Sequence, residues 1–264
     1  MNFDTAIGAA VTSLFIAKII GSVLPQVANV ALILAVLAIY NFDHLLDAKQ
    51  ISGEAISARH RFYQQNFTQL AIYQLVLLVA LLVISWYVPV AITKAGIILA
   101  VITLIYFLLL FIVLPQRFAF KEIMIAAVFA CGLFLAPLSV MSTQGISLDI
   151  VMLWLEIFLL AIANTLIFSY FDYENDIKEG HSSLAQIVGA KKIQSLSFLV
   201  LASLLIIILF SLTNDTIWID QIIILIMGLV LFGSLILGKH VKQNENLRIA
   251  AEAIFFIPLI RLIF

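Results

Sequence analysis

Apolar segments of about 20 residues recur along this chain, and they restrict its fold more than any other feature. An α-helix needs about 20 mostly apolar residues to cross the hydrocarbon core of a bilayer. The 264 residues are 64% hydrophobic and only 11% charged, and we expect nine crossings, at residues 5–23, 26–46, 67–88, 95–114, 122–142, 149–171, 193–213, 219–238 and 248–264. The sequence therefore predicts an all-α, polytopic membrane protein whose roughly nine transmembrane helices form one bundle, a single domain over residues 1–264.

The basic residues are distributed unevenly between the two sides of this predicted bundle. Eleven of the 14 Lys and Arg residues fall in the loops after the second, fourth, sixth and eighth spans, on the same side as the N-terminus. Cytoplasmic loops of membrane proteins carry such an excess of positive charge. We therefore expect a protein of the plasma (inner) membrane with its N-terminus in the cytoplasm and its C-terminus outside. A net charge of −1 without a basic patch argues against a nucleic-acid partner and leaves the lipid bilayer as the expected surroundings.

Two pairs of carboxylates with the same spacing follow the second and the sixth predicted span. The first pair is Asp43 and Asp47, and the second is Asp172 and Asp176. Acids four residues apart on a helix share one face and repel each other unless a cation lies between them. Mg²⁺ prefers oxygen ligands and keeps several coordination positions for the oxygens of a phosphate group. The four aspartates therefore predict a Mg²⁺ site on the cytoplasmic side, where they act as metal ligands and as catalytic residues. A solvated pair of surface acids is the alternative for either cluster alone.

A diphosphate at such a site needs positive side chains beside the metal, because four aspartates and a diphosphate would otherwise repel each other. Several basic residues lie in or next to the loops that follow the two pairs, and an amide precedes the first pair. The predicted substrate-binding residues are Asn41, Arg59, Arg61, Lys121 and Lys178.

Other polar residues allow more than one assignment from sequence. Tyr40, His44 and Tyr173 are adjacent candidates for accepting a proton during a reaction. Glu156 falls inside the sixth predicted span, where an acid either contacts substrate or makes a buried hydrogen bond. Glu252 in the ninth span is expected to extend toward the nearby cytoplasmic interface.

These patterns together resemble the UbiA superfamily of intramembrane prenyltransferases. Members have nine helices and two aspartate-rich motifs on the cytoplasmic loops after helices 2 and 6. The closer match is D-Y-E-N-D-I-K-E-G-H-S-S-L-A-Q-I-V-G at residues 172–189, with its acid pair, basic residue and glycines. The first motif departs from the family pattern, since Ile39 stands where an Asn is usual, and the basic segment at 57–62 ends without the usual proline.

The resemblance implies a function. Mg²⁺ held by the four aspartates would bind the diphosphate of an isoprenyl donor, and the isoprenyl group would pass to an aromatic or other lipophilic acceptor within the membrane. Two alternatives stay open. A non-catalytic relative would bind the isoprenoid diphosphate only, in keeping with the altered first motif. A transporter using acidic residues would place its charges near the middle of the bilayer.

Overall fold

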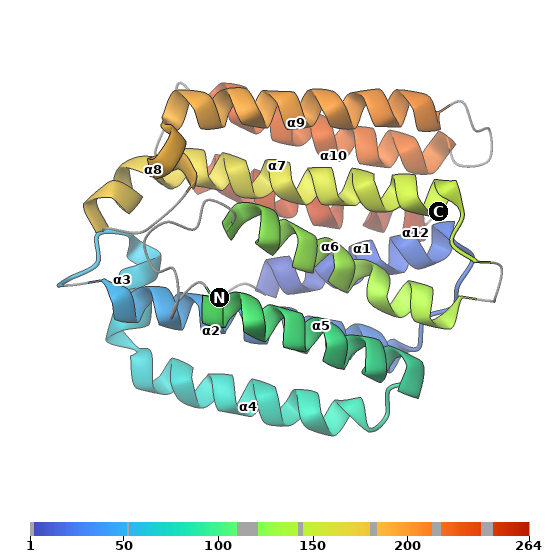
Figure 1. The fold of residues 1–264 in the computed structure, drawn as a ribbon, viewed down its shortest axis with the longest axis horizontal. Coiled ribbons are helices and arrows are strands. Elements are labelled where there is room, and N and C mark those ends of the chain that lie inside the picture. The colour runs from blue at the N-terminus through green and yellow to red at the C-terminus, as the bar shows by residue number, and fades with distance from the viewer. Residues whose placement is uncertain are drawn as a thin grey trace.

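The computed structural model describes residues 3–51, 53–109, 121–141, 145–179, 184–212, 218–238 and 245–263, and the regular secondary structure of these residues is helical. The longer helices are α1 (Phe3–Ile19), α2 (Gln26–Gln50), α4 (Phe67–Ser85), α5 (Val90–Leu108), α6 (Lys121–Val140), α7 (Leu148–Glu179), α9 (Ala190–Ser211) and α10 (Trp218–Gly238). The short helices are α3 (Ala58–Gln65), α8 (Leu184–Val188), α11 (Glu245–Glu252), the 3₁₀-helix η2 (Ala253–Phe256) and α12 (Leu259–Ile263). Figure 1 shows the long helices along a common direction in one bundle, with α3 and α8 at the same end.

Seven of these helices, α2, α4, α5, α6, α7, α9 and α10, are long and apolar enough to cross a membrane. The outer faces of the bundle carry large apolar side chains, such as Leu82 at 66% exposure and Leu199 at 64%. Exposed apolar surface of this extent requires a partner, and lipid supplies it. The chain is therefore a multi-pass integral membrane protein, as the sequence predicts.

The first and last of the nine expected spans differ from these seven helices. α1 has 17 residues, and the segment expected as one helix at 248–264 is divided among α11, η2 and α12. Pro258 has no N–H to donate, and its ring clashes with the preceding turn of an α-helix. Here the backbone uses the tighter i to i−3 bonds of a 3₁₀-helix, such as Ile257 N–H to Ile254 O at 3.0 Å. The expectation of one continuous helix at this place is therefore wrong.

Some predicted features fall outside the described residues. They include Gly180 and residues 181–183 of the second motif, and the basic residues of the loops at 110–120 and 239–244. The orientation in the membrane, which the charge asymmetry predicts, therefore stays a prediction.

α7 lies at the centre of the bundle, in contact with α6, α8, α9, α10 and α11. Its buried acid, Glu156, is 0% exposed and accepts hydrogen bonds from Ser211 Oγ at 2.8 Å and Gln221 Nε2 at 3.0 Å. Of the two alternatives for this residue, the structure supports the buried hydrogen bond. Glu156 and Asp172 are 16 positions apart, which is about 24 Å along a helix. Glu156 therefore joins α7 to α9 and α10 far from the aspartate pairs.

The close approach of α1 to η2 depends on Gly8. A Cβ atom at Gly8 would lie 2.9 Å from Cβ of Phe255, whereas nothing lies within 4 Å of the Cβ position at Gly96 in α5. Both Gly→Ala changes gain helix propensity, but only Gly8→Ala overpacks a contact between helices. We expect Gly8→Ala to be about 1–3 kcal/mol less stable than Gly96→Ala in unfolding of the solubilised protein. Equal unfolding free energies of the two variants would show that this contact is not close-packed.

Candidate cation and anion site

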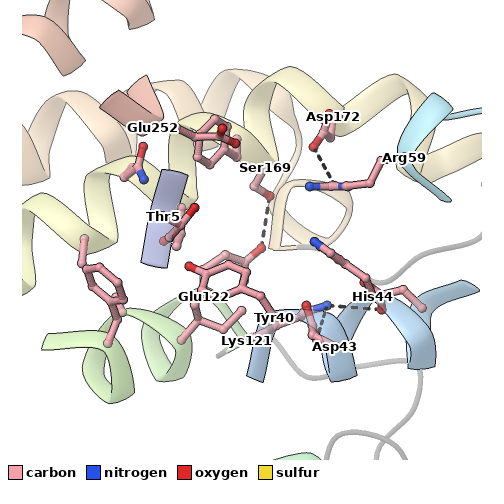
Figure 2. A pocket seen from close by; sticks show the side chains of 18 of the residues that line it. Thr5, Tyr40, Asp43, His44, Arg59, Lys121, Glu122, Ser169, Asp172 and Glu252 are labelled. Carbon is pink, nitrogen blue, oxygen red and sulfur yellow. Dashed lines mark hydrogen bonds and ion pairs between the residues drawn. The ribbon is translucent and has the colours of Figure 1, made fainter. Parts of the chain in front are cut away.

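Both aspartate pairs line one cavity, although they come from distant parts of the chain. Asp43 and Asp47 lie near the end of α2, and Asp172 and Asp176 lie near the end of α7. Residues four apart on a helix point to the same side, so each helix presents its pair to the same space. Figure 2 shows Asp43 and Asp172 on opposite sides of this space.

The α2 side of the cavity holds a lysine between its two acids. Lys121, the first residue of α6, places Nζ 3.6 Å from Asp47 Oδ1 and 3.9 Å from Asp43 Oδ1. This Asp43 oxygen is buried and accepts no hydrogen bond from the described residues. The Lys121 charge offsets the repulsion that two acids one turn apart would otherwise cause.

Three side chains of α2 are arranged so that they are able to hold a metal ion. One ligand atom from each of Asp43, His44 and Asp47 lies within 4.8 Å of the other two. Carboxylate oxygens suit Mg²⁺, and an imidazole nitrogen would add a softer ligand. The His44 ring packs edge-on against Tyr63 of α3, with 5.1 Å between the ring centroids. Burial raises the pKa of the Tyr63 phenol. The residues therefore fit a divalent cation on the α2 side.

On the α7 side of the cavity, an arginine of α3 lies beside the aspartate pair. Arg59, in α3, places Nη2 3.7 Å from Asp172 Oδ2 (Figure 2), and Asp176 lines the same cavity. The cavity thus has a Lys beside one aspartate pair and an Arg beside the other. Each of these two basic side chains is able to exchange its contact with a carboxylate for a contact with the oxygens of a bound anion.

Glu179, the last residue of α7, anchors the start of α3. Its Oε1 accepts hydrogen bonds from the backbone N–H groups of Ile56 at 2.7 Å and Ser57 at 2.6 Å, and its Oε2 lies 2.5 Å from His60 Nδ1. Ser57 then caps α3 by accepting a hydrogen bond from the His60 N–H at 3.1 Å. These contacts fix the helix that carries Arg59. Neither Glu179 nor His60 is predicted from sequence to belong to the site, although Glu179 is a third acid on the face that carries Asp172 and Asp176.

A second acid missed from sequence, Glu122, joins three helices at the cavity wall. Its Oε1 accepts hydrogen bonds from Ser169 Oγ of α7 at 3.1 Å and from the Leu184 N–H at the start of α8 at 2.8 Å. Its Oε2 is buried without a hydrogen-bond partner among the described residues. No sequence signal separates Glu122 from an ordinary charged residue at the start of a membrane helix.

Three predicted substrate-binding residues do not line this cavity. Asn41 Nδ2 donates to Leu70 O at 3.2 Å and Gln74 Oε1 at 2.9 Å, so it links α2 to α4. Arg61 donates to Ala55 O at 3.1 Å and is half-exposed, and Lys178 is exposed. The lining residues include Arg59 and Lys121 but none of these three.

The other residues predicted from sequence also include some that line the cavity and some that do not. Tyr40 and His44 line the cavity, whereas Tyr173 does not. Glu252 also lines the cavity, and its extension toward the cytoplasmic interface stays a prediction. The chain turns into η2 directly after Glu252, and the buried Ala251, Ile254 and Phe255 hold this turn against the core.

The described lining residues carry far more negative than positive charge. Six carboxylates face two permanently positive side chains, namely Asp43, Asp47, Glu122, Asp172, Asp176 and Glu252 against Arg59 and Lys121. Unpaired charge is costly beside an apolar interior, so this excess favours the binding of cations.

Comparisons of the chain with models of protein families, with curated proteins and with solved structures find no match. The likeness to intramembrane prenyltransferases therefore rests on the residues alone.

Proposed function

We propose that this protein is a UbiA-like prenyltransferase that moves an isoprenyl group from a prenyl diphosphate to an aromatic or other lipophilic acceptor in a Mg²⁺-dependent reaction. The observation that carries the proposal is that Asp43, Asp47, Asp172 and Asp176 line one cavity with Lys121 and Arg59 between them. Acid pairs that meet across a bundle, with one cation beside each, suit a metal-bound diphosphate better than they suit open solvent.

Different side chains would have different roles in such a reaction. The aspartates would hold the metal, and Lys121 and Arg59 would bind diphosphate oxygens and stabilise the negative charge that develops as the diphosphate leaves. When bound, Mg²⁺ supplies further positive charge to that leaving group. Apolar lining side chains such as Ile125 and Phe168 exclude water from the cation-like allylic carbon.

The size of the cavity indicates which parts of the substrates it holds. Its volume is about 190 Å³, which is smaller than the ~300–1,000 Å³ of pockets that enclose drug-sized ligands. We infer that the cavity takes the reacting groups, and that the isoprenoid tail lies among apolar side chains of the bundle and lipid. In this proposal α1 and the divided C-terminal segment are the two further crossing elements of a nine-helix bundle, with the aspartates on the cytoplasmic side.

The positions of the acids argue against a transporter. Asp43 and Asp47 lie in the last two turns of α2, and Asp172 and Asp176 lie in the last two turns of α7. A transporter that uses intramembrane acids would place them near the middle of the bilayer.

A binding measurement tests the proposal without knowledge of the acceptor. The purified protein is unfolded by heat with geranyl, farnesyl or geranylgeranyl diphosphate, each with and without Mg²⁺. A ligand at 100 times its Kd stabilises the folded state by about 2.7 kcal/mol, which raises Tm by about 5–10 °C in a chain of this length. We expect this rise only with Mg²⁺. No rise with any of the three donors would contradict the proposal, and a rise without turnover of any acceptor would indicate the non-catalytic relative.

A further inference from the structure

A second group of buried polar side chains lies in the bundle, outside the aspartate cavity. It consists of Glu156 of α7, Ser211 at the end of α9 and Gln221 in the first turn of α10, and all three are buried. Figure 1 shows that α9 begins beside α8 and runs to the opposite end of the bundle, so Ser211 lies far from the aspartate pairs. The proposed reaction uses none of these three side chains.

Among the described residues, the Glu156 carboxylate contacts only neutral hydrogen-bond donors. Its Oε1 accepts from Ser211 Oγ at 2.8 Å, and its Oε2 accepts from Gln221 Nε2 at 3.0 Å. The nearest acid in sequence to Gln221 is different, because Asp220 Oδ1 lies 2.7 Å from Nε of Arg261. Buried charges in proteins are paired with an opposite charge or bind a metal ion. The negative charge of Glu156 therefore calls for a cation that no described basic side chain supplies.

Gln221 adds an oxygen atom without a partner. The side chain is 2% exposed, and no described residue donates a hydrogen bond to its Oε1. Nε2 of the same amide group contacts the carboxylate, so Oε1 lies beside it as well. A buried acceptor without a donor is destabilising and requires an explanation, such as a bound ion. The amide oxygen and the carboxylate thus point to the same missing positive charge.

The chemistry of these groups selects a small monovalent cation. Carboxylate, amide and hydroxyl oxygens are hard ligands, and the Ser211 hydroxyl keeps lone pairs for a cation while it donates to Glu156. The last turn of α9 ends here, and the final carbonyl oxygens of a helix have no partner within the helix. A divalent ion such as Ca²⁺ would bring more positive charge than this one carboxylate balances. Na⁺ balances it and is smaller than K⁺, which suits a closely packed cluster.

We propose that Glu156, Ser211 and Gln221 bind one Na⁺ ion, which joins α7 to α9 and α10. Rotation of the Gln221 amide would bring Oε1 to the ion next to the carboxylate. The proposal does not depend on the proposed function, since these residues lie away from the aspartate pairs. It makes the stability of this end of the bundle depend on a specific ion.

Thermal unfolding tests the site. The solubilised protein is dialysed against choline chloride at mildly alkaline pH and then titrated with NaCl or KCl at constant ionic strength. With Na⁺ at about ten times its Kd, we expect Tm to be about 3–6 °C higher than in choline chloride alone. K⁺ at the same concentration should raise Tm less. Binding of radioactive Na⁺ to the purified protein gives the affinity directly.

Variants locate the ion. Glu156→Gln keeps the size of the side chain but removes its charge, and it should lose both Na⁺ binding and the rise in Tm. Gln221→Leu should weaken Na⁺ binding at least about tenfold, because even outer-shell partners contribute 10–100-fold to metal affinity. Asp149→Asn, at an exposed acid in the first turn of α7, is the matched control. Asp172→Asn is the control for the aspartate cavity, and both controls should respond to Na⁺ like wild type.

The same Tm of wild type in all three salts would overturn the site and leave the cluster with hydrogen bonds only. So would Na⁺ binding that Glu156→Gln retains and Asp172→Asn loses, because the ion would then lie in the aspartate cavity. If Glu156→Gln does not fold, Gln221→Leu and Ser211→Ala decide, and an unchanged Na⁺ affinity in both would also overturn the site.

Discussion

Asp43→Asn and Asp172→Asn should each lower Mg²⁺-dependent prenyl transfer by at least about 100-fold and remove the stabilisation by prenyl diphosphate, because loss of even an outer-shell partner costs 10–100-fold at metal sites. Asn keeps the size of Asp but carries no charge. The measurement is transfer of radiolabel from the donor, together with Tm with and without Mg²⁺.

The same variants should be at least as stable as wild type when Mg²⁺ and donor are absent. Asp43 and Asp47 share one lysine, so removal of one acid lowers the repulsion in an already negative cavity. Glu174→Gln is the control, since Glu174 is exposed on the same end of α7 and does not line the cavity. If Asp172→Asn keeps half of the wild-type activity, or if Glu174→Gln loses as much, the aspartates are not the metal ligands.

Glu179→Ala should release α3 from the end of α7. The change removes a carboxylate that accepts from two backbone N–H groups and contacts the His60 ring. Each hydrogen bond to a charged group contributes about 1.5–3 kcal/mol, so the helix should open at least about ten times more often. Trypsin, which cleaves after arginine, should then cut at Arg59 or Arg61 at least tenfold faster. Transfer activity should fall about 10–100-fold, because Arg59 no longer stays beside Asp172.

Two further variants separate this positioning role from general destabilisation. Glu179→Gln keeps an acceptor oxygen for the Ile56 and Ser57 N–H groups, and it should restore most of the protease resistance. Glu174→Ala should digest like wild type. The role of Glu179 would be disproved by equal digestion of wild type and Glu179→Ala, with the cut sites identified by mass spectrometry.

The membrane helices were predictable because the physical requirement is local. A segment must be apolar over about 20 residues whatever its neighbours are, so the seven long helices follow from their own composition. The same reasoning failed at the C-terminal segment, which is apolar enough but contains Pro258. The length and hydropathy of a segment do not take into account the backbone N–H group that proline lacks.

The aspartate pairs were predictable for a similar reason, since spacing on one helix places both carboxylates on one face. The partners of polar residues across the bundle were not predictable from sequence. Asn41 resembles a substrate ligand in sequence, but Gln74 of α4 binds its amide instead. Arg59 and Arg61 look equivalent in sequence, and only the anchoring of α3 turns Arg59 toward Asp172 and Arg61 toward Ala55. The orientation of the two arginines depends on a distant residue, since Glu179 and Ser57 are 122 positions apart.

The contact between Thr12 and Phe255 spans 243 positions, and it has a consequence for the synthesis of the protein. In the proposed nine-helix bundle this contact would lie in the bilayer, where backbone groups need partners within the protein, so the carbonyl of Phe255 at the helix break would rely on the Thr12 hydroxyl. In the proposed nine-helix bundle α1 would enter the membrane long before residues 253–263 exist, and Thr12 would lack this neighbour until they are made. Insertion of α1 would therefore precede its final packing by almost the whole elongation time.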